Sequence, residues 1–186
     1  MTARAGMTSH IRPARKADIP RICAIARQVC RRVKQHRRGR LRTPLEFRTT
    51  RRYYERALKN RSRCLLVATT QAGRAIGYAL AGVESEPDDL TDVPRVDIAE
   101  LAVDSRARRR GIGQALLEAT HDWARSQGVG LVQLAVWEFN RPALRLYDRA
   151  GYHTLMRKME LVLKVARPAC HSNPGRTRHR PNATPR

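Results

Sequence analysis

The chain has 186 residues, enough for one domain with a sizeable core and too few for two. Hydrophobic residues make up 41% and aromatic residues 5% of the sequence, and no stretch approaches the roughly 20 apolar residues that span a bilayer. No apolar run precedes a small-residue cleavage pattern at the N-terminus, so we expect no secretory signal, no membrane association and a cytoplasmic location.

The net charge of +22 is distributed unevenly. Residues 1–60 carry 18 basic side chains against 3 acidic ones, residues 61–166 carry 15 against 13, and residues 167–186 carry 5 against none. The excess would attract an anionic partner, although thin aromatic content beside it does not favour nucleic acid. Because 33 of the 38 basic residues are arginine, biased codon composition explains the excess equally well.

The N-terminal third predicts one strand and two helices. Residues 1–9 are expected to be disordered, and His10–Ala14 predicts a short strand. Apolar residues then recur at helical spacing from Ile22 to Val33, with Asp18 placed to cap the helix. The arginine-rich stretch 35–43 breaks this periodicity and predicts a loop, and a second helix is predicted over 44–60.

Strands and helices alternate through the remainder of the predicted domain, 10–166. Two strands over 64–69 and 75–83 are joined by a tight turn, which predicts a hairpin. Further elements are predicted as follows: a loop over 84–94, strands over 96–103 and 131–137, helices over 112–127 and 142–150, and one or two closing strands over 152–164. Residues 167–186 lack any apolar period and predict a basic disordered tail.

The cysteine and histidine pattern predicts no metal site. Four cysteines form neither a Cys-x-x-Cys pair nor a disulfide-dense framework. Cys170, His171 and His179 stand together in the tail, but no second ligand pair lies at zinc spacing.

A basic, glycine-containing loop opens the helix predicted over 112–127. The loop consists of Arg108, Arg109, Arg110, Gly111, Ile112 and Gly113. The first N–H groups of a helix have no partner within it, the helix dipole favours negative charge there, and glycine permits close approach. The loop therefore predicts a phosphate-binding site.

This loop and its surroundings resemble the GCN5-related N-acetyltransferase (GNAT) family. Leu101-Ala102-Val103-Asp104 precedes the Arg-x-x-Gly-x-Gly pattern, and Tyr147-Asp148-Arg149-Ala150-Gly151-Tyr152 resembles the Tyr-x-x-x-Gly-aromatic signature downstream. The match is close over about 96–162. It implies an α/β fold with a mixed, largely antiparallel sheet of six to seven strands, helices on both faces, and a splay between strands 4 and 5.

The resemblance also implies acetyl-CoA as co-substrate, without a metal. The backbone N–H groups of Leu101 and Val103 would bind the pantetheine arm and the thioester, with Val103 polarising the carbonyl, and residues 108–113 would bind the pyrophosphate. Asn140 would contact the arm; a helix cap or Asx-turn is the other interpretation. Tyr147 would protonate the departing thiolate. The alternative interpretation is a structural tyrosine packed between a helix and the sheet.

Glu100 is the favoured general base. Period-two alternation places its side chain on the face opposite Leu101 and Val103. Glu138 and Glu84 are the alternatives, and an ion pair at the strand edge is the structural alternative for Glu100. Where some protein N-terminal acetyltransferases of the family carry a fifth-strand glutamate, this chain has Ala135.

Two functions are therefore compatible with the sequence. The first is an acetyl-CoA-dependent N-acetyltransferase that acts on a primary amine by direct attack in a ternary complex. The second is a catalytically idle acyl-CoA-binding sensor or interaction module. The resemblance implies that the first two helices and their connection form one wall of the acceptor site. The basic residues of these helices then favour an acidic peptide, a protein or an anionic small molecule over polyamines and aminoglycosides, which are cations. The sequence does not identify the acceptor, and it is compatible with either a monomer or a homodimer.

Overall fold

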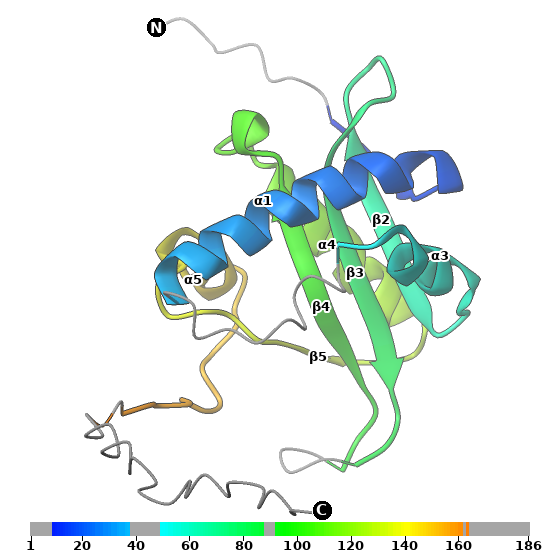
Figure 1. Ribbon diagram of the computed structural model, residues 1–186. Coiled ribbons are helices and arrows are strands. Elements are labelled where there is room, and N and C mark those ends of the chain that lie inside the picture. The colour runs from blue at the N-terminus through cyan, green and yellow to red at the C-terminus, as the bar shows by residue number, and fades with distance from the viewer. Residues whose placement is uncertain (1–8, 38–48, 88–91, 162, 164–186) are drawn as a thin grey trace, which may run out of the picture. The chain divides into compact units, whose positions relative to one another are not determined.

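The computed structural model describes residues 9–37, 49–87, 92–161 and 163. Contacts between Cα atoms divide the chain into two units, Met1–His153 and Thr154–Arg186. The first unit (Figure 1) contains β1 (His10–Pro13), β2 (Arg63–Thr69), β3 (Ala75–Glu84), β4 (Arg95–Val103), β5 (Leu131–Leu134), α1 (Ile19–Arg37), α3 (Arg51–Lys59), α4 (Ile112–Ser126), α5 (Arg141–Arg149) and the 3-10 turns η1 (Lys16–Asp18) and η2 (Ser105–Ala107).

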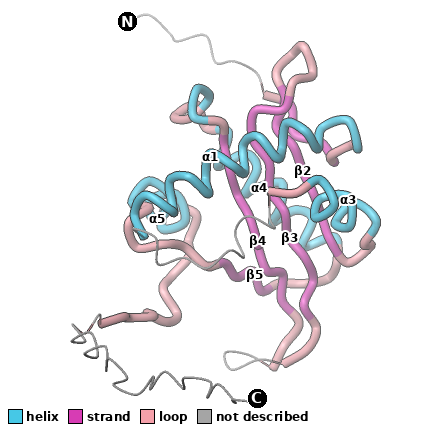
Figure 2. Tube along the Cα trace, in the orientation of Figure 1, coloured by secondary structure: helices cyan, strands magenta, loops and turns pink. Residues whose placement is uncertain are grey.

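The strands form one sheet in the order β1-β2-β3-β4-β5. The pairs β1–β2, β2–β3 and β3–β4 are antiparallel, and β5 alone runs parallel to its neighbour, β4. A parallel pair needs a long crossover, which α4 supplies between the two strands (Figure 2). The predicted mixed, largely antiparallel sheet and the predicted hairpin are confirmed.

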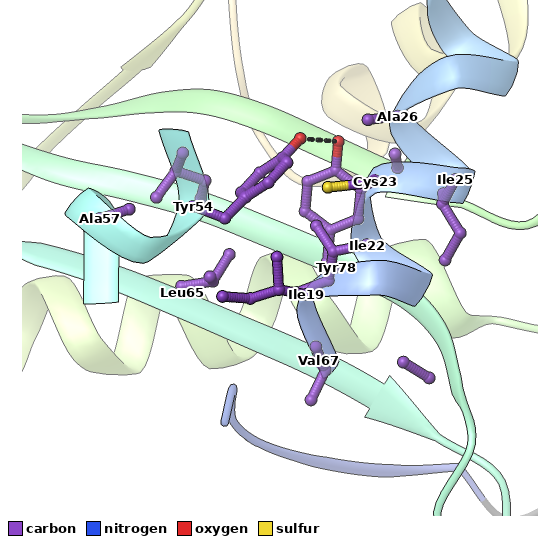
Figure 3. Packing of buried hydrophobic residues seen from close by; sticks show 13 residues of the cluster. Ile19, Ile22, Cys23, Ile25, Ala26, Tyr54, Ala57, Leu65, Val67 and Tyr78 are labelled. Atoms are coloured by element: carbon purple, nitrogen blue, oxygen red, sulfur yellow. Dashed lines mark hydrogen bonds between the residues drawn. The ribbon is translucent and has the colours of Figure 1, made fainter. Parts of the chain in front are cut away.

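Helices α1 and α3 cover one face of the sheet. Ile19, Ile22 and Ile25 of α1 are fully buried against Val67 of β2 and Tyr78 of β3 (Figure 3). The helical spacing of these isoleucines places them on one stripe, so burying that stripe fixes α1 on the sheet. Outside this stripe, α1 carries exposed residues that include Arg27 and Arg31.

Helix α4 covers the opposite face. Ile112, Leu116 and Leu117 are buried against alternate residues of β2 and β3, including Ala68 and Ala79. Leu146 and Tyr147 of α5 pack on the adjoining part of this layer. Helices therefore lie on both faces, as predicted, and the sheet is buried between them.

The end of α1 differs from the prediction. The loop expected over 35–43 begins later, because α1 continues to Arg37. Its last turn is held by tertiary contacts that periodicity cannot reveal: the His36 ring stacks on Phe139, with centroids 4.1 Å apart and an 8° interplanar angle. Residues 38–48, which include the start of the predicted second helix, lie outside the described residues, and α3 begins at Arg51 behind the capping hydroxyl of Thr50.

Asp18 also differs from its predicted role. Its carboxylate closes the η1 turn by accepting from the Arg15 backbone N–H at 2.7 Å, and it forms an ion pair with Arg12 at 2.8 Å. Burial opposes ionisation, but these donors outweigh it and lower the pKa of Asp18 below its ordinary value. The residue therefore fixes the chain ahead of α1 instead of capping α1 itself.

The second unit corrects the predicted strand count. Its described residues, 154–161 and 163, form neither helix nor strand, so no closing strand is found among the described residues of 152–164, and the described part of the chain has five strands where six to seven were expected. Met159 and Leu161 are 89% and 83% exposed. Alternating apolar residues favour a strand only when one face is buried, and that condition is not met here. The tail boundary at 166 stays a prediction, because residues 164–186 lie outside the described residues.

No helix in the described part of the chain is both long enough and apolar enough to cross a membrane.

Candidate active site

The pairing between β4 and β5 ends partway along β4, beside a β-bulge in the β3–β4 ladder. Leu80 of β3 pairs with Glu100, whereas Ala81 pairs with Ile98, so Ala99 is an extra residue in β4. The parallel register with β5 ends where Ile98 meets Leu134. From Ala99 onward β4 continues past the end of β5, and the predicted splay is therefore present.

Two backbone N–H groups of β4 point into this gap. The Asp104 N–H donates to the Ile76 carbonyl at 2.8 Å, which makes that pair a hydrogen-bonded one. Backbone groups alternate in direction along an antiparallel ladder, so the N–H groups of Val103 and Leu101 face away from β3. They lie on the side where β5 has already ended.

The loop between β4 and α4 exposes the start of the helix. Gly111 occupies the N-cap position with φ +77° and no side-chain cap, and its carbonyl accepts the first helical hydrogen bond, from Ala115. The N–H groups of Ile112, Gly113 and Gln114 precede that bond and have no acceptor within the helix. The Ile112 side chain is buried in the core, so this residue offers the site only its backbone.

The arginines of the loop differ in what holds them. The Arg108 guanidinium donates to the Val103 carbonyl at 3.1 Å, which ties the loop to the end of β4. Arg109 has φ +64°, a left-handed conformation that costs a non-glycine residue energy. All three arginine side chains, Arg108 to Arg110, are exposed to solvent.

Helix α5 closes the gap from the other side. A Cβ atom on Gly113 would lie 3.4 Å from Cδ2 of Leu146 and 3.9 Å from Cγ2 of Val103. The first turn of α4, the end of β4 and α5 therefore converge, and Tyr147 follows Leu146 on α5. Asn140 occupies the N-cap position of α5, but its side chain makes no capping hydrogen bond. Its amide is therefore not engaged as a helix cap.

Tyr147 is a half-buried phenol beside this convergence. Its ring centroid lies 5.7 Å from that of Tyr152, and both rings pack on the layer formed by α4. Burial raises the pKa of Tyr147 to about 12, because removal of water disfavours the phenolate. The hydroxyl is therefore protonated at neutral pH and able to donate.

Glu100 lies on the opposite face of the sheet, under α1 and α3. Its Oε2 atom accepts hydrogen bonds from Tyr54 at 2.8 Å and from Tyr78 at 2.5 Å. Burial and the adjacent carboxylate raise the pKa of both phenols far above the ordinary value, so both act as donors. The sequence did not indicate this cluster, because Tyr54 and Tyr78 belong to segments separated by 24 residues.

The alternative carboxylates do not join the site. Glu138 is exposed and forms an ion pair with Arg141 at 3.0 Å, and Glu84 is exposed at the end of β3. Of the three carboxylates considered from the sequence, Glu100 alone lies within the sheet beside the gap.

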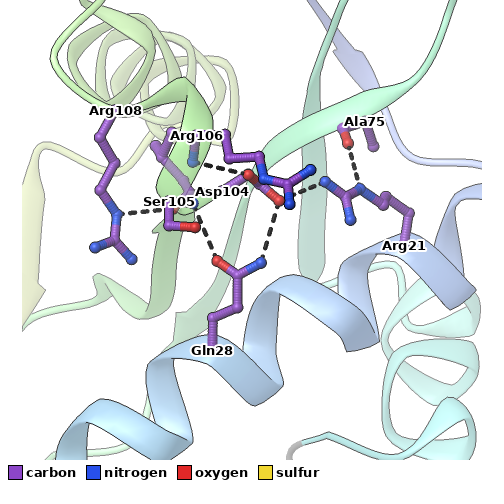
Figure 4. A network of polar contacts seen from close by, with 8 residues as sticks. Arg21, Gln28, Ala75, Asp104, Ser105, Arg106 and Arg108 are labelled. Carbon is purple, nitrogen blue, oxygen red and sulfur yellow. Dashed lines mark hydrogen bonds and ion pairs between the residues drawn. The ribbon is translucent and has the colours of Figure 1, made fainter.

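Asp104 couples the loop to α1, and this network was also missed from the sequence. The carboxylate accepts from the Arg21 guanidinium, from the Gln28 amide at 3.2 Å and from the Arg106 backbone N–H at 3.0 Å (Figure 4). Gln28 in turn accepts from the Ser105 N–H at 3.0 Å. Burial opposes ionisation, but the hydrogen bonds outweigh it and hold the pKa of Asp104 below its ordinary value.

The Asp104→Asn variant is expected to unfold with a free energy about 2 kcal/mol lower at pH 7, because a buried acceptor of charged donors is lost. A carboxyl whose folded pKa is depressed stabilises the protein above its unfolded pKa, about 3.9, and that stabilisation disappears as the pH falls through the folded value. Urea unfolding at pH 7 and pH 3 should therefore show a smaller acid loss in the variant. Equal losses in both proteins would contradict the network's role.

Aromatic side chains join α1 to the segment between β5 and α5. Phe139, which stacks on His36, also stacks against Trp137 with centroids 6.0 Å apart, and the Arg37 guanidinium lies 5.4 Å from the Trp137 centroid. Trp137 remains 40% exposed. An aromatic surface therefore adjoins the described end of α1.

Comparison with known proteins agrees with this geometry. The sequence model of the acetyltransferase (GNAT) family matches residues 30–152. The mycothiol acetyltransferase of Propionibacterium freudenreichii is 32% identical over 112 residues, which are 60% of this chain and 34% of that protein. The chain thus spans about a third of the length of this relative.

Solved structures share the fold over most of the chain. A tetramutant of the BH1408 protein from Bacillus halodurans is 25% identical, with a TM-score of 0.74 over 83% of this chain and 99% of the other. AAC(6')-Iy, solved with the bisubstrate analogue CoA-S-monomethyl-acetylneamine, is 18% identical, with a TM-score of 0.61 over 85% of this chain and 99% of the other.

The chain belongs to the acetyltransferase (GNAT) family, because the family match covers well over half of its length and includes β4, the loop of residues 108–113 and Tyr147. The resemblance inferred from the sequence is confirmed.

Proposed function

We propose that the protein is an N-acetyltransferase that moves an acetyl group from acetyl-CoA to a primary amine within a ternary complex. The observation that carries this proposal is the gap between β4 and β5, into which the Val103 and Leu101 N–H groups point beside an uncapped helix start. A family relative named as an acetyltransferase and a neighbour solved with a CoA-containing analogue support it.

The residues of the gap fit the parts of acetyl-CoA in order. The pyrophosphate would bind the N–H groups and arginines of residues 108–113, since a helix start and charged donors both favour an anion. The Leu101 N–H and the Asn140 amide would bind amides of the pantetheine arm. The Val103 N–H would donate to the thioester oxygen and stabilise the charge that develops on it during attack.

Acetyl transfer then follows from these placements. The neutral amine attacks the thioester carbon and forms the C–N bond, and the tetrahedral oxyanion collapses with loss of the thiolate. Tyr147 would donate its phenolic proton to that thiolate, and Glu100, the proposed general base, would accept a proton from the new ammonium. Tyr147 and Glu100 belong to opposite faces of the sheet, so donor and base would act from opposite sides of the gap.

Glu100 would accept the amine proton through water, because its Oε2 atom already holds two phenols. The Glu100→Gln variant should lower kcat about 100-fold and lose the acid limb of the pH–rate profile, while acetyl-CoA affinity stays unchanged. The amide oxygen can still accept from the phenols, so folding should be retained. Tyr54→Phe keeps the carboxylate and is the matched control, with a far smaller effect on kcat expected.

The decisive experiment combines titration calorimetry with an acceptor panel. Acetyl-CoA should bind the folded protein in the micromolar range, and release of CoA thiol should identify amines that are acetylated. Absence of binding at tens of micromolar acetyl-CoA would reject the proposal. The panel should include acidic peptides and carboxylated or phosphorylated small amines, because α1 carries the exposed arginines Arg27 and Arg31.

One observation favours the second candidate, an idle acyl-CoA-binding module. The Oε2 atom of Glu100 already accepts hydrogen bonds from Tyr54 and Tyr78, which leaves this atom less accessible to an amine or a water molecule. A protein of this kind would bind acetyl-CoA with the same affinity and yet release no CoA thiol with any amine of the panel. The same two measurements therefore separate the two candidates.

A further inference from the structure

A polar cavity lies beside the start of the β4–α4 loop, on the side of α1. Its volume is about 320 Å³, and it is bounded by α1, the start of β3 and the η2 turn. Its lining residues are Arg21, Gln28, Arg31, Arg74, Asp104, Ser105 and Arg106. None of the acyl-transfer roles proposed above uses these side chains.

The cavity has a large positive excess. Four of its lining residues are arginines and one is an aspartate, so its formal charge is +3. Asp104, only 4% exposed, is committed to Arg21, whose guanidinium also donates to the Ala75 carbonyl at 3.1 Å. Among the described residues, no carboxylate forms an ion pair with Arg31, Arg74 or Arg106.

The fixed network prepares the cavity for an anion. Asp104 and Gln28 hold Arg21 and the η2 backbone in place, so these groups need little reorganisation when a ligand arrives (Figure 4). The three arginines approach the same space from different segments: Arg31 from α1, Arg74 from the turn before β3, and Arg106 from η2. Their mutual repulsion falls when a negative group lies between them.

We infer that this cavity binds a phosphate monoester. A doubly charged phosphate offsets more of the +3 charge than a carboxylate does, and its three terminal oxygens can accept from several guanidinium groups at once. The Ser105 hydroxyl, which also lines the cavity, adds a neutral donor. The continuous segment 104–113 thus contributes both to this site and to the loop proposed for the pyrophosphate.

The monoester has two sources. One is the 3'-phosphate of coenzyme A itself, in which case the inference rests on the proposed function. The other is a phosphate group on a different molecule, such as a phosphorylated acceptor, and this source does not depend on acetyl-CoA binding.

The experiment compares wild type with Arg31→Gln/Arg74→Gln and with a control, Arg27→Gln/Arg61→Gln, which removes the same charge from exposed positions outside the cavity. The first probe is inorganic phosphate, measured as the rise in Tm over chloride of equal ionic strength. Phosphate should raise the Tm of wild type and control but not of the cavity variant. Equal rises in all three proteins, or no rise in any, would overturn the site.

The second probe identifies the source by calorimetry with CoA and 3'-dephospho-CoA. If the cofactor supplies the phosphate, wild type should bind CoA about tenfold more tightly than 3'-dephospho-CoA. The Arg31→Gln/Arg74→Gln variant should then bind the two compounds with equal affinity. Equal binding of both compounds by wild type, together with an arginine-dependent phosphate effect, assigns the cavity to a different phosphate monoester. Failure to bind either compound rejects the proposed function, while the phosphate measurement still tests the cavity.

Discussion

Acetyl-CoA binding should be lost when Gly111 and Gly113 are both replaced by valine, with affinity falling about 100-fold or more. Two physical effects combine in this variant. Gly111 has φ +77°, a conformation that valine adopts only with strain, so the helix start would shift away from the phosphate. At Gly113 the new side chain would enter the space between Leu146 and Val103, where the pantetheine arm would pass.

The matched control is Gly130→Val, at a glycine with no atom within 4 Å of its added Cβ and no left-handed φ. Circular dichroism should show native helix content in both proteins, and calorimetry should show wild-type affinity in the control. The single variant Gly113→Val removes any ambiguity from strain at Gly111. Unchanged acetyl-CoA affinity in the folded double variant would show that the loop does not bind the cofactor.

Tyr147→Phe should lower kcat about 100-fold and leave acetyl-CoA affinity unchanged, because the hydroxyl acts only when the thiolate departs. The ring is retained, so packing against Tyr152 is kept. Presteady-state or steady-state release of CoA thiol at saturating acetyl-CoA measures the effect. A turnover number equal to that of wild type would assign Tyr147 a purely structural role.

Tyr152→Phe is the matched control for this variant. Burial also raises the pKa of Tyr152 to about 12, but its hydroxyl is already bonded to His121 at 2.8 Å. Because the Tyr147 pKa is also about 12, its proton is retained through neutral pH and is lost only as the pH approaches that value. Wild type should therefore show no alkaline loss from this group below about pH 10, and Tyr147→Phe should lack the loss above it.

Local sequence patterns predicted the elements whose buried side chains recur at regular spacing along the chain. Helical spacing of Ile19, Ile22 and Ile25 in α1 reports one buried stripe, and the same holds for Leu116 and Leu117 in α4. The segment 152–164 shows the limit of such patterns. Its alternation describes side chains that suit a strand, but a strand also needs a neighbouring backbone, and the sequence does not specify one.

The candidate site was predictable where one continuous segment forms it. Residues 101–113 carry the end of β4, the loop and the helix start together, and the family pattern covers all of them. Tyr54 and Tyr78 at Glu100, and Arg21 and Gln28 at Asp104, come from distant elements. Their residue types have no distinctive spacing, so only the folded chain shows that they meet.

Ala99 matters because it adds one position to β4, and not because of the chemistry of its side chain. Val96 and Ile98 pack with α4, whereas Glu100 and Ala102 contact the α1 and α3 layer, so the single extra residue reverses the side-chain parity of β4 partway along. Without Ala99, Ile98 and Glu100 would be consecutive and would pair with Ala81 and Leu80 in a regular ladder, so Glu100 and Leu101 would keep their present faces. A one-residue deletion here would therefore straighten β4 and remove the bulge, while the residues of each face stayed where they are.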